Sequence, residues 1–166
     1  MKLKILWIGK TRSSPIKALT EDYLDRIRRI MPCEILEIRD PARGRVPRAS
    51  ERIQLEGEDI FRQLTKSAFI VALDESGTEY ASEEFARRLE NEQNAGTKEM
   101  TFIIGGPDGL SRDVASRARM VLSLGKMTWT HEMCRVLLLE QIYRALCILH
   151  KIPYHKGSPT TPDRRG

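Results

Sequence analysis

The sequence predicts an α/β fold: a single domain with a mostly parallel sheet and helices on both faces. Three observations support this fold class. Short apolar runs typical of strands alternate along the chain with longer segments of helical periodicity. Residues 68–73 (AFIVAL) are continuously apolar, as in a strand buried on both faces. The 166 residues contain no internal repeat and no linker-like segment, which favours one domain.

The first half of the chain is predicted to be β-α-β-α. Residues 2–9 (KLKILWIG) and 33–38 are short β-type runs. Between them, Ser14 and Pro15 supply an N-cap and a first-turn proline for a helix. A polar loop follows at residues 39–50. The next helix is marked by Ile53, Gly57, Ile60, Phe61 and Leu64.

The second half is predicted to continue this alternation. The expected elements are a strand at 68–73, a turn at 74–77, a helix capped by Ser82, a strand at 100–104, a short helix capped by Ser111, a strand at 120–124 and a helix at about 132–150.

The last helix is apolar on nearly all sides, which is typical of a helix buried on more than one side. In a small domain one face would meet the sheet, so we expect the other face to meet a partner chain. A homodimer is the simplest such assembly. Glu140 and Arg144 are four residues apart and are expected to pair along this helix.

Composition narrows the functional class. The chain carries 28 basic and 23 acidic residues, a net charge of +5 that permits a nucleic-acid partner without requiring one. Three cysteines without a C-x-x-C spacing argue against disulfides and a zinc site, so no metal is expected. The chain opens without a signal-peptide pattern, and its most apolar stretch, residues 136–149, is interrupted by polar residues. We therefore expect a cytoplasmic protein without a membrane span.

Ligands of open α/β sheets bind beyond the carboxyl ends of the strands, and here the loops after Leu73, Ile104 and Leu124 qualify. Residues 102–111 (FIIGGPDGLS) place three glycines within five positions after the fourth strand. Their spacing matches neither a dinucleotide fingerprint nor a P-loop, which disfavours phosphate binding. Two interpretations stay open: a tight turn only, or a backbone that lines a neutral ligand such as a nucleoside.

The loop after the fifth strand, residues 125–131 (GKMTWTH), is unusually apolar for a loop. Met127 and Trp129 could be core residues, and His131 could simply make a hydrogen bond at the start of the helix. Their occurrence together at the carboxyl edge favours binding. Arg135 stands near the same helix N-terminus, where the helix dipole disfavours a cation, so either a structural ion pair or a substrate contact would explain it.

Three segments, FIIGGPDGLS, LSLGKMTWTHEMCRVLLLEQIYRA and IPYHK, occur in an order that resembles the bacterial pseudouridine N3-methyltransferases of large-subunit ribosomal RNA. These enzymes belong to the SPOUT (α/β-knot) superfamily. The resemblance covers residues 1–156 as one domain and leaves 157–166 as a flexible tail. It implies a C-terminal trefoil knot and an obligate homodimer with the cofactor pocket at the subunit interface. The substrate that it implies is a pseudouridine of 23S ribosomal RNA in the assembled ribosome.

The resemblance further implies S-adenosyl-L-methionine as cofactor, held by backbone from three loops. Carried over by motif, the cofactor-binding residues are Leu73, Gly105, Leu124, Gly125, Lys126, Met127, Thr128 and Trp129. The catalytic candidates are His155 first, His131 second, and Arg135 to stabilise negative charge or hold a phosphate. Tyr154, His155 and Lys156, with Arg135, are the expected RNA contacts.

The sequence departs from the family pattern in two places. Thr130 stands where the family often has proline before His131, and ten residues, with Arg164 and Arg165, follow Lys156. Three alternatives remain: a SPOUT methyltransferase for another RNA such as transfer RNA, a non-enzymatic RNA-binding assembly factor, and a nicotinamide-dependent oxidoreductase. The missing dinucleotide fingerprint disfavours the last of these.

Overall fold

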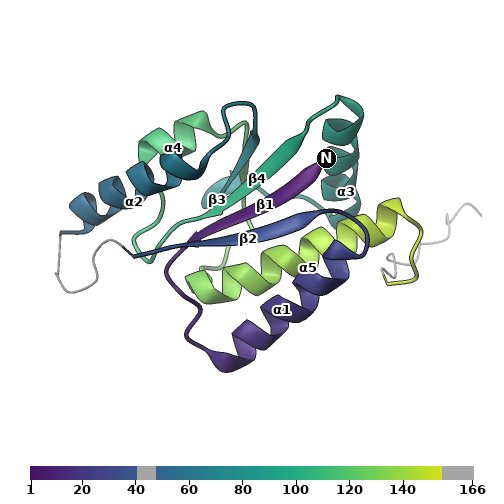
Figure 1. Ribbon diagram of the computed structural model, residues 1–166, viewed down its shortest axis with the longest axis horizontal. Helices are drawn as coiled ribbons and strands as arrows, with labels where there is room; N and C mark the ends of the chain where they lie inside the picture. Colours follow the sequence, from purple (N-terminus) through teal and green to yellow (C-terminus); the bar gives the residue numbers. More distant parts are fainter. Residues whose placement is uncertain (41–47, 155–166) are drawn as a thin grey trace, which may run out of the picture.

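The computed structural model describes residues 1–40 and 48–154, and a five-stranded sheet lies at its centre (Figure 1). The strands are β1 (Lys2–Ile8), β2 (Cys33–Ile38), β3 (Phe69–Thr78), β4 (Glu99–Ile104) and β5 (Met120–Leu122). Their order is β2-β1-β4-β3-β5, and every pairing is parallel. The predicted parallel α/β architecture is confirmed.

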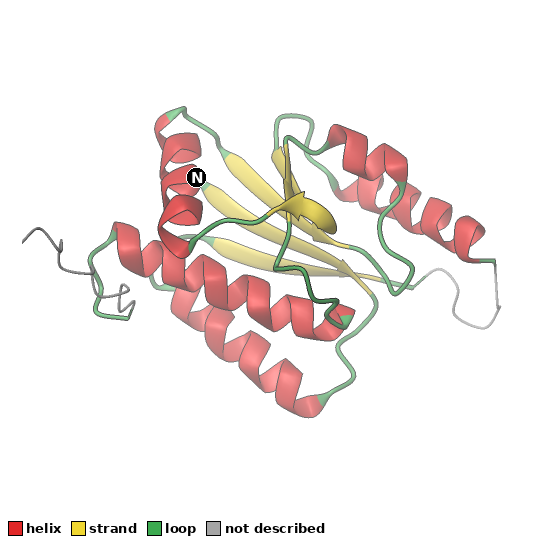
Figure 2. Ribbon diagram, turned by 180° about the vertical axis from the view of Figure 1, so that it is seen from behind, coloured by secondary structure: helices red, strands yellow, loops and turns green. Residues whose placement is uncertain are grey.

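Helices cover both faces of the sheet, as the sequence predicts (Figures 1 and 2). The helices are α1 (Ser14–Arg28), α2 (Ala49–Gln63), α3 (Ser82–Asn94), α4 (Arg112–Arg117) and α5 (His131–Leu149). The period-2 alternation of β1 divides the core. Leu3, Ile5 and Trp7 pack into the larger apolar cluster with α1, α3 and α5, whereas Leu6 and Ile8 pack into the smaller cluster with α2 and α4.

Strand β3 differs from the prediction, which placed a turn at residues 74–77. The strand assignment continues to Thr78, yet Leu122 of β5 pairs with both Leu73 and Thr78, so the residues between them are looped out. The Asp74 carboxylate accepts a hydrogen bond from the Ser76 amide at 2.9 Å, which bends the chain locally. The chain therefore turns here as a bulge within the strand, and its return extends the pairing with β5.

Two predicted helix caps are shifted by one residue. The helix α1 is capped at Ser13 rather than Ser14, and α3 at Ala81 rather than Ser82. Among the described residues, no side chain caps the first amides of α3, and the Glu84 carboxylate in its first turn instead accepts from the Ala81 backbone amide at 2.9 Å. The Ser111 cap of α4 is confirmed, because its Oγ accepts from the Val114 amide at 3.2 Å.

The apolar circumference of α5 is explained largely within the chain. This helix packs on α1 and on α3 beside the sheet, so neighbours of the same chain occupy the sides that the sequence assigned to a partner (Figure 2). The apolarity of α5 therefore does not by itself require a second subunit. The predicted pairing along α5 is confirmed: Arg144 Nε donates to Glu140 at 3.0 Å. None of the described helices combines the length and the apolar character needed to cross a bilayer.

Candidate functional site

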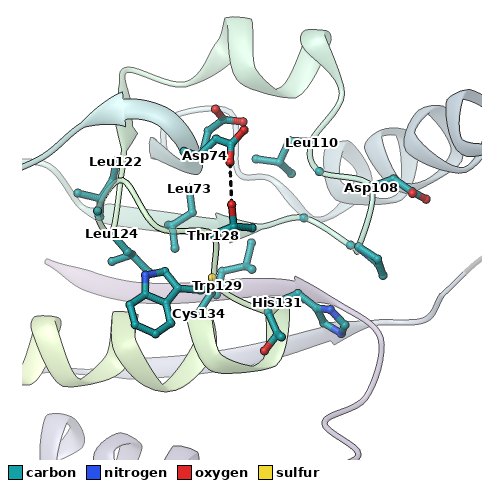
Figure 3. Close-up of a pocket in the computed structure, with 18 of the residues that line it drawn as sticks. Leu73, Asp74, Asp108, Leu110, Leu122, Leu124, Thr128, Trp129, His131 and Cys134 are labelled. Atoms are coloured by element: carbon teal, nitrogen blue, oxygen red, sulfur yellow. Dashed lines mark hydrogen bonds between the residues drawn. The ribbon is translucent and has the colours of Figure 1, made fainter.

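Three loops meet around one cavity because β4, β3 and β5 are neighbours in the sheet and their carboxyl ends share an edge. The cavity has a volume of about 660 Å³ (Figure 3). Its lining residues are Leu73, Asp74, Glu75, Ile104, Gly105, Gly106, Pro107, Asp108, Gly109, Leu110, Leu122, Leu124, Gly125, Met127, Thr128, Trp129, Thr130, His131 and Cys134.

All of the residues predicted to bind the cofactor line this cavity, with the exception of Lys126. Of the catalytic candidates, His131 lines it and Arg135 does not. Tyr154 is also absent from the lining, and His155, Lys156 and the predicted tail lie outside the described residues. The structure thus brings together the loop residues of the prediction, which come from three separate parts of the sequence.

The glycines after β4 form a closed turn, residues 105–109, which we call the glycine turn. The Gly109 amide donates to the Gly106 carbonyl at 3.1 Å, and Gly109 has a φ of +88°, a conformation that favours glycine. A Cβ added at Gly105 would lie 2.6 Å from the Gly109 carbonyl oxygen. Glycine at position 105 is therefore needed for the turn to close, and the closed turn forms one wall of the cavity.

The loop after β5 is held by side chains that contact backbone. Ser123 Oγ accepts from the Gly125 amide at 3.2 Å and contacts the Gly125 carbonyl at 3.1 Å, while Gly125 has a φ of +119°. Thr128 Oγ1 donates to Glu75 at 3.4 Å, which links this loop to the one after β3 (Figure 3). At the end of the loop, Thr130 caps α5 by accepting from the Met133 amide at 3.3 Å. A threonine hydroxyl thus fixes the chain immediately before His131.

His131 is the first residue of α5 and lines the cavity, where it is partly buried near the positive charge of Arg135. Burial, and then the positive charge of Arg135, lower the pKa of its imidazole below the usual 6.5. His131 is therefore neutral at pH 7, and a neutral imidazole can accept a proton. Beside it, burial raises the pKa of the Cys134 thiol, which keeps that cavity-lining side chain uncharged.

Arg135 lies in the core with 1 % of its surface exposed. Its guanidinium donates to the Ile8 carbonyl at 2.8 Å and to Thr11 Oγ1 at 2.7 Å, and it stacks 4.9 Å from the centroid of the Trp7 ring. One turn earlier, the Glu132 carboxylate accepts from two backbone amides of the β1–α1 connection, at 2.9 and 3.2 Å. The first turn of α5 therefore holds this connection beside the cavity.

Replacing Arg135 by Met is expected to lower the free energy of unfolding by about 3 kcal/mol, because it removes buried hydrogen bonds of a charged group. Denaturation in urea, followed by circular dichroism, measures this loss. The matched control is Arg12→Met in the same connection, whose side chain is exposed and whose loss should change stability by less than about 0.5 kcal/mol. Equal effects of the two variants would contradict a positioning role for Arg135.

Tyr154 packs in a cluster with side chains of α1 and α5. Its ring packs edge-on against Tyr143 with centroids 4.8 Å apart, and its hydroxyl lies 3.4 Å from that of Tyr23 and 3.2 Å from the Glu140 carboxylate. Burial, followed by the contact with Tyr23, raises the pKa of Tyr154 above its usual value of 10. These contacts fix the position of the chain at the point where the described residues end, immediately before His155.

Sequence reasoning missed the acidic side chains of the site. Asp74 and Glu75 follow the buried part of β3 directly and line the cavity, together with Asp108 of the glycine turn. The rule that pointed to the loop after Leu73 would also have pointed to these two carboxylates. Within the described part of the chain, no three His, Cys, Asp or Glu side chains gather as they would around a metal ion.

Comparison with known proteins gives a consistent result. The family model for predicted SPOUT methyltransferases matches residues 1–155. A ribosomal RNA large subunit methyltransferase H of Trichlorobacter lovleyi is 45% identical over 155 residues, which are 93% of this chain and 99% of that protein. A protein of the same name from Allorhizobium ampelinum is 38% identical over 160 residues, 95% of this chain and 100% of the relative.

A solved structure supports the fold. The structure of a probable methylase family protein from Haemophilus influenzae Rd KW20 matches with a TM-score of 0.52 at 13% identity, covering 96% of this chain and 72% of that one. With a family model that spans almost the whole chain and relatives about two-fifths identical over nearly their full length, the chain belongs to the SPOUT methyltransferase family.

Proposed function

We propose that this chain is an S-adenosyl-L-methionine-dependent methyltransferase that modifies N3 of a pseudouridine in 23S ribosomal RNA, within the assembled ribosome in the cytoplasm. The observation that carries the proposal is the cavity at the carboxyl edge, where the glycine turn and the loops after β3 and β5 meet. Membership in the family supports methyl transfer, and the names of the relatives support large-subunit ribosomal RNA as the substrate.

The cavity fits a nucleoside cofactor by its chemistry. Leucines 73, 110, 122 and 124 provide apolar walls for a flat base, and glycines 105, 106 and 125 leave main-chain groups accessible for its polar edge. Asp74 and Glu75 supply carboxylates suited to ribose hydroxyls or to the positive charge of a sulfonium. When bound, this cofactor supplies an electrophilic methyl group.

The contribution of the protein is to position the acceptor and to manage one proton. Holding two reactants in alignment is worth up to roughly 7–11 kcal/mol of the barrier, so we assign the larger share to positioning. N3 of pseudouridine carries an imide proton, which a neutral imidazole can accept. We propose His155 as the first candidate for this role and His131, which lines the cavity, as the second. Tyr154 and Lys156 are proposed to contact the RNA, and Arg135 to hold the β1–α1 connection beside the site.

We also propose that the chain forms a homodimer and that its C-terminal part is knotted as the family resemblance implies. Large apolar side chains support the dimer: Met127 is 74%, Trp129 42% and Met133 36% exposed, and all three lie in or directly after the loop that follows β5. A second copy that covers them would complete the cavity. Light scattering on the purified chain tests this, with an expected mass of twice the 19.0 kDa of one chain.

Methylation assays test the function. Incubation with labelled S-adenosyl-L-methionine is expected to transfer label to ribosomes and not to bulk transfer RNA, with N3-methylpseudouridine found by mass spectrometry of the ribosomal RNA. Label in transfer RNA instead would support the other methyltransferase function. S-Adenosylhomocysteine at about 100 times its Kd should raise Tm by roughly 5 °C or more. No shift and no transfer would instead indicate an assembly factor.

A further inference from the structure

A buried carboxyl group lies against the glycine turn on the side of α2. Glu56 has 2% of its surface exposed, and it does not line the cavity. A Cβ added at Gly106 would lie 2.6 and 2.7 Å from its two carboxylate oxygens, so the carboxyl group packs directly on the Gly106 backbone. Gly106 itself lines the cavity, so only the Gly106 backbone separates the Glu56 carboxyl group from the proposed cofactor site.

Glu56 is one of three contacts between α2 and this part of the chain. Arg52, one helical turn earlier, pairs with Asp108 of the glycine turn at 3.1 Å. At Gly57, the residue after Glu56, an added Cβ would lie 2.6 Å from Ser111 Oγ. Helix α2 therefore approaches the cap of α4 as closely as a glycine permits. Arg52 and Glu56 are four residues apart on one face of the helix and contact Asp108 and Gly106 within the glycine turn, while Gly57 packs on Ser111 just after it.

The burial of Glu56 is unfavourable for the fold. Neither carboxylate oxygen has a hydrogen bond of normal geometry within the described chain. Burial, then the charge of Asp40, raise the pKa of Glu56 to about 7, against the lowering effects of the Gly106 amide and Arg52. Asp108 also raises this pKa, and these are the charged groups of the described chain that act on it from the segment after β2, from α2 and from the turn.

We propose that Glu56 is a positioning residue for the proposed cofactor site: its carboxylate attracts the Gly106 amide and holds the glycine turn in the shape that lines the cavity. This inference rests on the proposed function. The Gly106 amide and Arg52 both favour the ionised form, so the ionised carboxylate holds the turn most firmly, and a protonated carboxyl group holds it less. Affinity for the cofactor should therefore fall as the pH drops through about 7.

Stability should respond in the opposite direction, which separates positioning from a merely structural role. Because the folded pKa lies above the unfolded value, the folded chain keeps a proton that the unfolded chain has released between about pH 4.3 and 7. Stability therefore decreases as the pH rises through this window. Replacing Glu56 by the neutral isostere Gln is expected to raise Tm at pH 8 by roughly 5 °C and to leave it nearly unchanged at pH 5.

The test uses calorimetric titration of the full chain with S-adenosylhomocysteine at pH values from 6 to 8.5. The wild type is expected to bind about tenfold more weakly at pH 6 than at pH 8, with a midpoint near 7. Glu56→Gln should bind about tenfold more weakly than wild type at pH 8 and lose this midpoint. Subtracting the pH profile of Glu56→Gln from that of the wild type removes the pH dependence of affinity that comes from titration of the ligand and of His131. Glu58→Gln, exposed on the same helix, is the control and should follow the wild type.

Hydrogen exchange decides the inference independently of the ligand. Protection of the Gly106 amide in the free chain at pH 8 is expected to fall about tenfold in Glu56→Gln. If the Gly106 amide of Glu56→Gln is protected as strongly as in the wild type, the positioning role is overturned. The same conclusion follows if Glu56→Gln has a lower Tm at pH 8 but binds with the wild-type pH profile. If the wild type fails to bind S-adenosylhomocysteine at every pH, the proposed function fails, whereas the exchange result still tests whether Glu56 holds the turn.

Discussion

Replacing Gly105 by Val is expected to abolish binding of S-adenosylhomocysteine and, with it, all methylation. The structure gives a specific reason. A Cβ at position 105 would lie 2.6 Å from the Gly109 carbonyl oxygen, 2.7 Å from its carbon and 3.1 Å from a methyl group of Leu110. The first two contacts are with backbone, which cannot rotate away as a side chain can. The glycine turn must therefore open, and the wall of the cavity that it forms is lost.

A graded pair of variants makes this prediction quantitative. Gly105→Ala introduces the clash with one methyl group and should weaken binding at least tenfold, whereas Gly105→Val should weaken it more than a hundredfold, or about 2.8 kcal/mol. Calorimetry measures both affinities, and circular dichroism verifies that each variant is folded. Ala95→Val adds bulk at an exposed position just after α3, far from the carboxyl edge, and should bind normally. Unchanged affinity of Gly105→Val would remove the glycine turn from the proposed site.

The sequence could predict the position of this site because the ends of the strands and the loops that follow them are marked by patterns within a few residues. The apolar run that ends at Leu73 and the glycines after Ile104 mark the carboxyl ends of two strands, and parallel pairing brings these ends to one edge. The loop after β5 was predicted for the same reason. None of these inferences needs knowledge of which side chains touch.

What the sequence could not show depends on contacts between distant segments. By pattern Gly57 belongs to the apolar face of a helix, whereas in the structure it lets α2 approach Ser111. The sequence predicts an ion pair or a substrate contact for Arg135, but the structure gives it carbonyl and hydroxyl partners more than a hundred residues earlier in the chain. Glu56 is an ordinary helix glutamate by pattern, and only the packing of α2 on the glycine turn shows that it is buried.

The two histidine candidates make different predictions. His155→Ala is expected to reduce methylation of ribosomes by about 10²–10⁴-fold, the usual contribution of a general base, while the affinity for S-adenosylhomocysteine stays within twofold of wild type. Single-turnover assays with ribosomes, combined with calorimetry, separate the two quantities. A near-normal rate in this variant would remove His155 from the catalytic candidates and leave His131, which lines the cavity at the start of α5.

The pH dependence of the rate then identifies the base. Burial and the charge of Arg135 both disfavour the imidazolium form of His131, so its pKa lies below 6.5 and it is neutral throughout the range above that value. If His131 accepts the proton, the rate at saturating S-adenosyl-L-methionine falls only at a lower pH than for an imidazole with the usual pKa of 6.5, as His131 becomes protonated. His131→Asn, which keeps a hydrogen-bonding side chain, should then lose about a hundredfold in rate. A decline of this rate that already begins between pH 7.5 and 6.5, at cofactor concentrations that saturate the site at every pH, would instead indicate a base whose pKa is not lowered, which excludes His131.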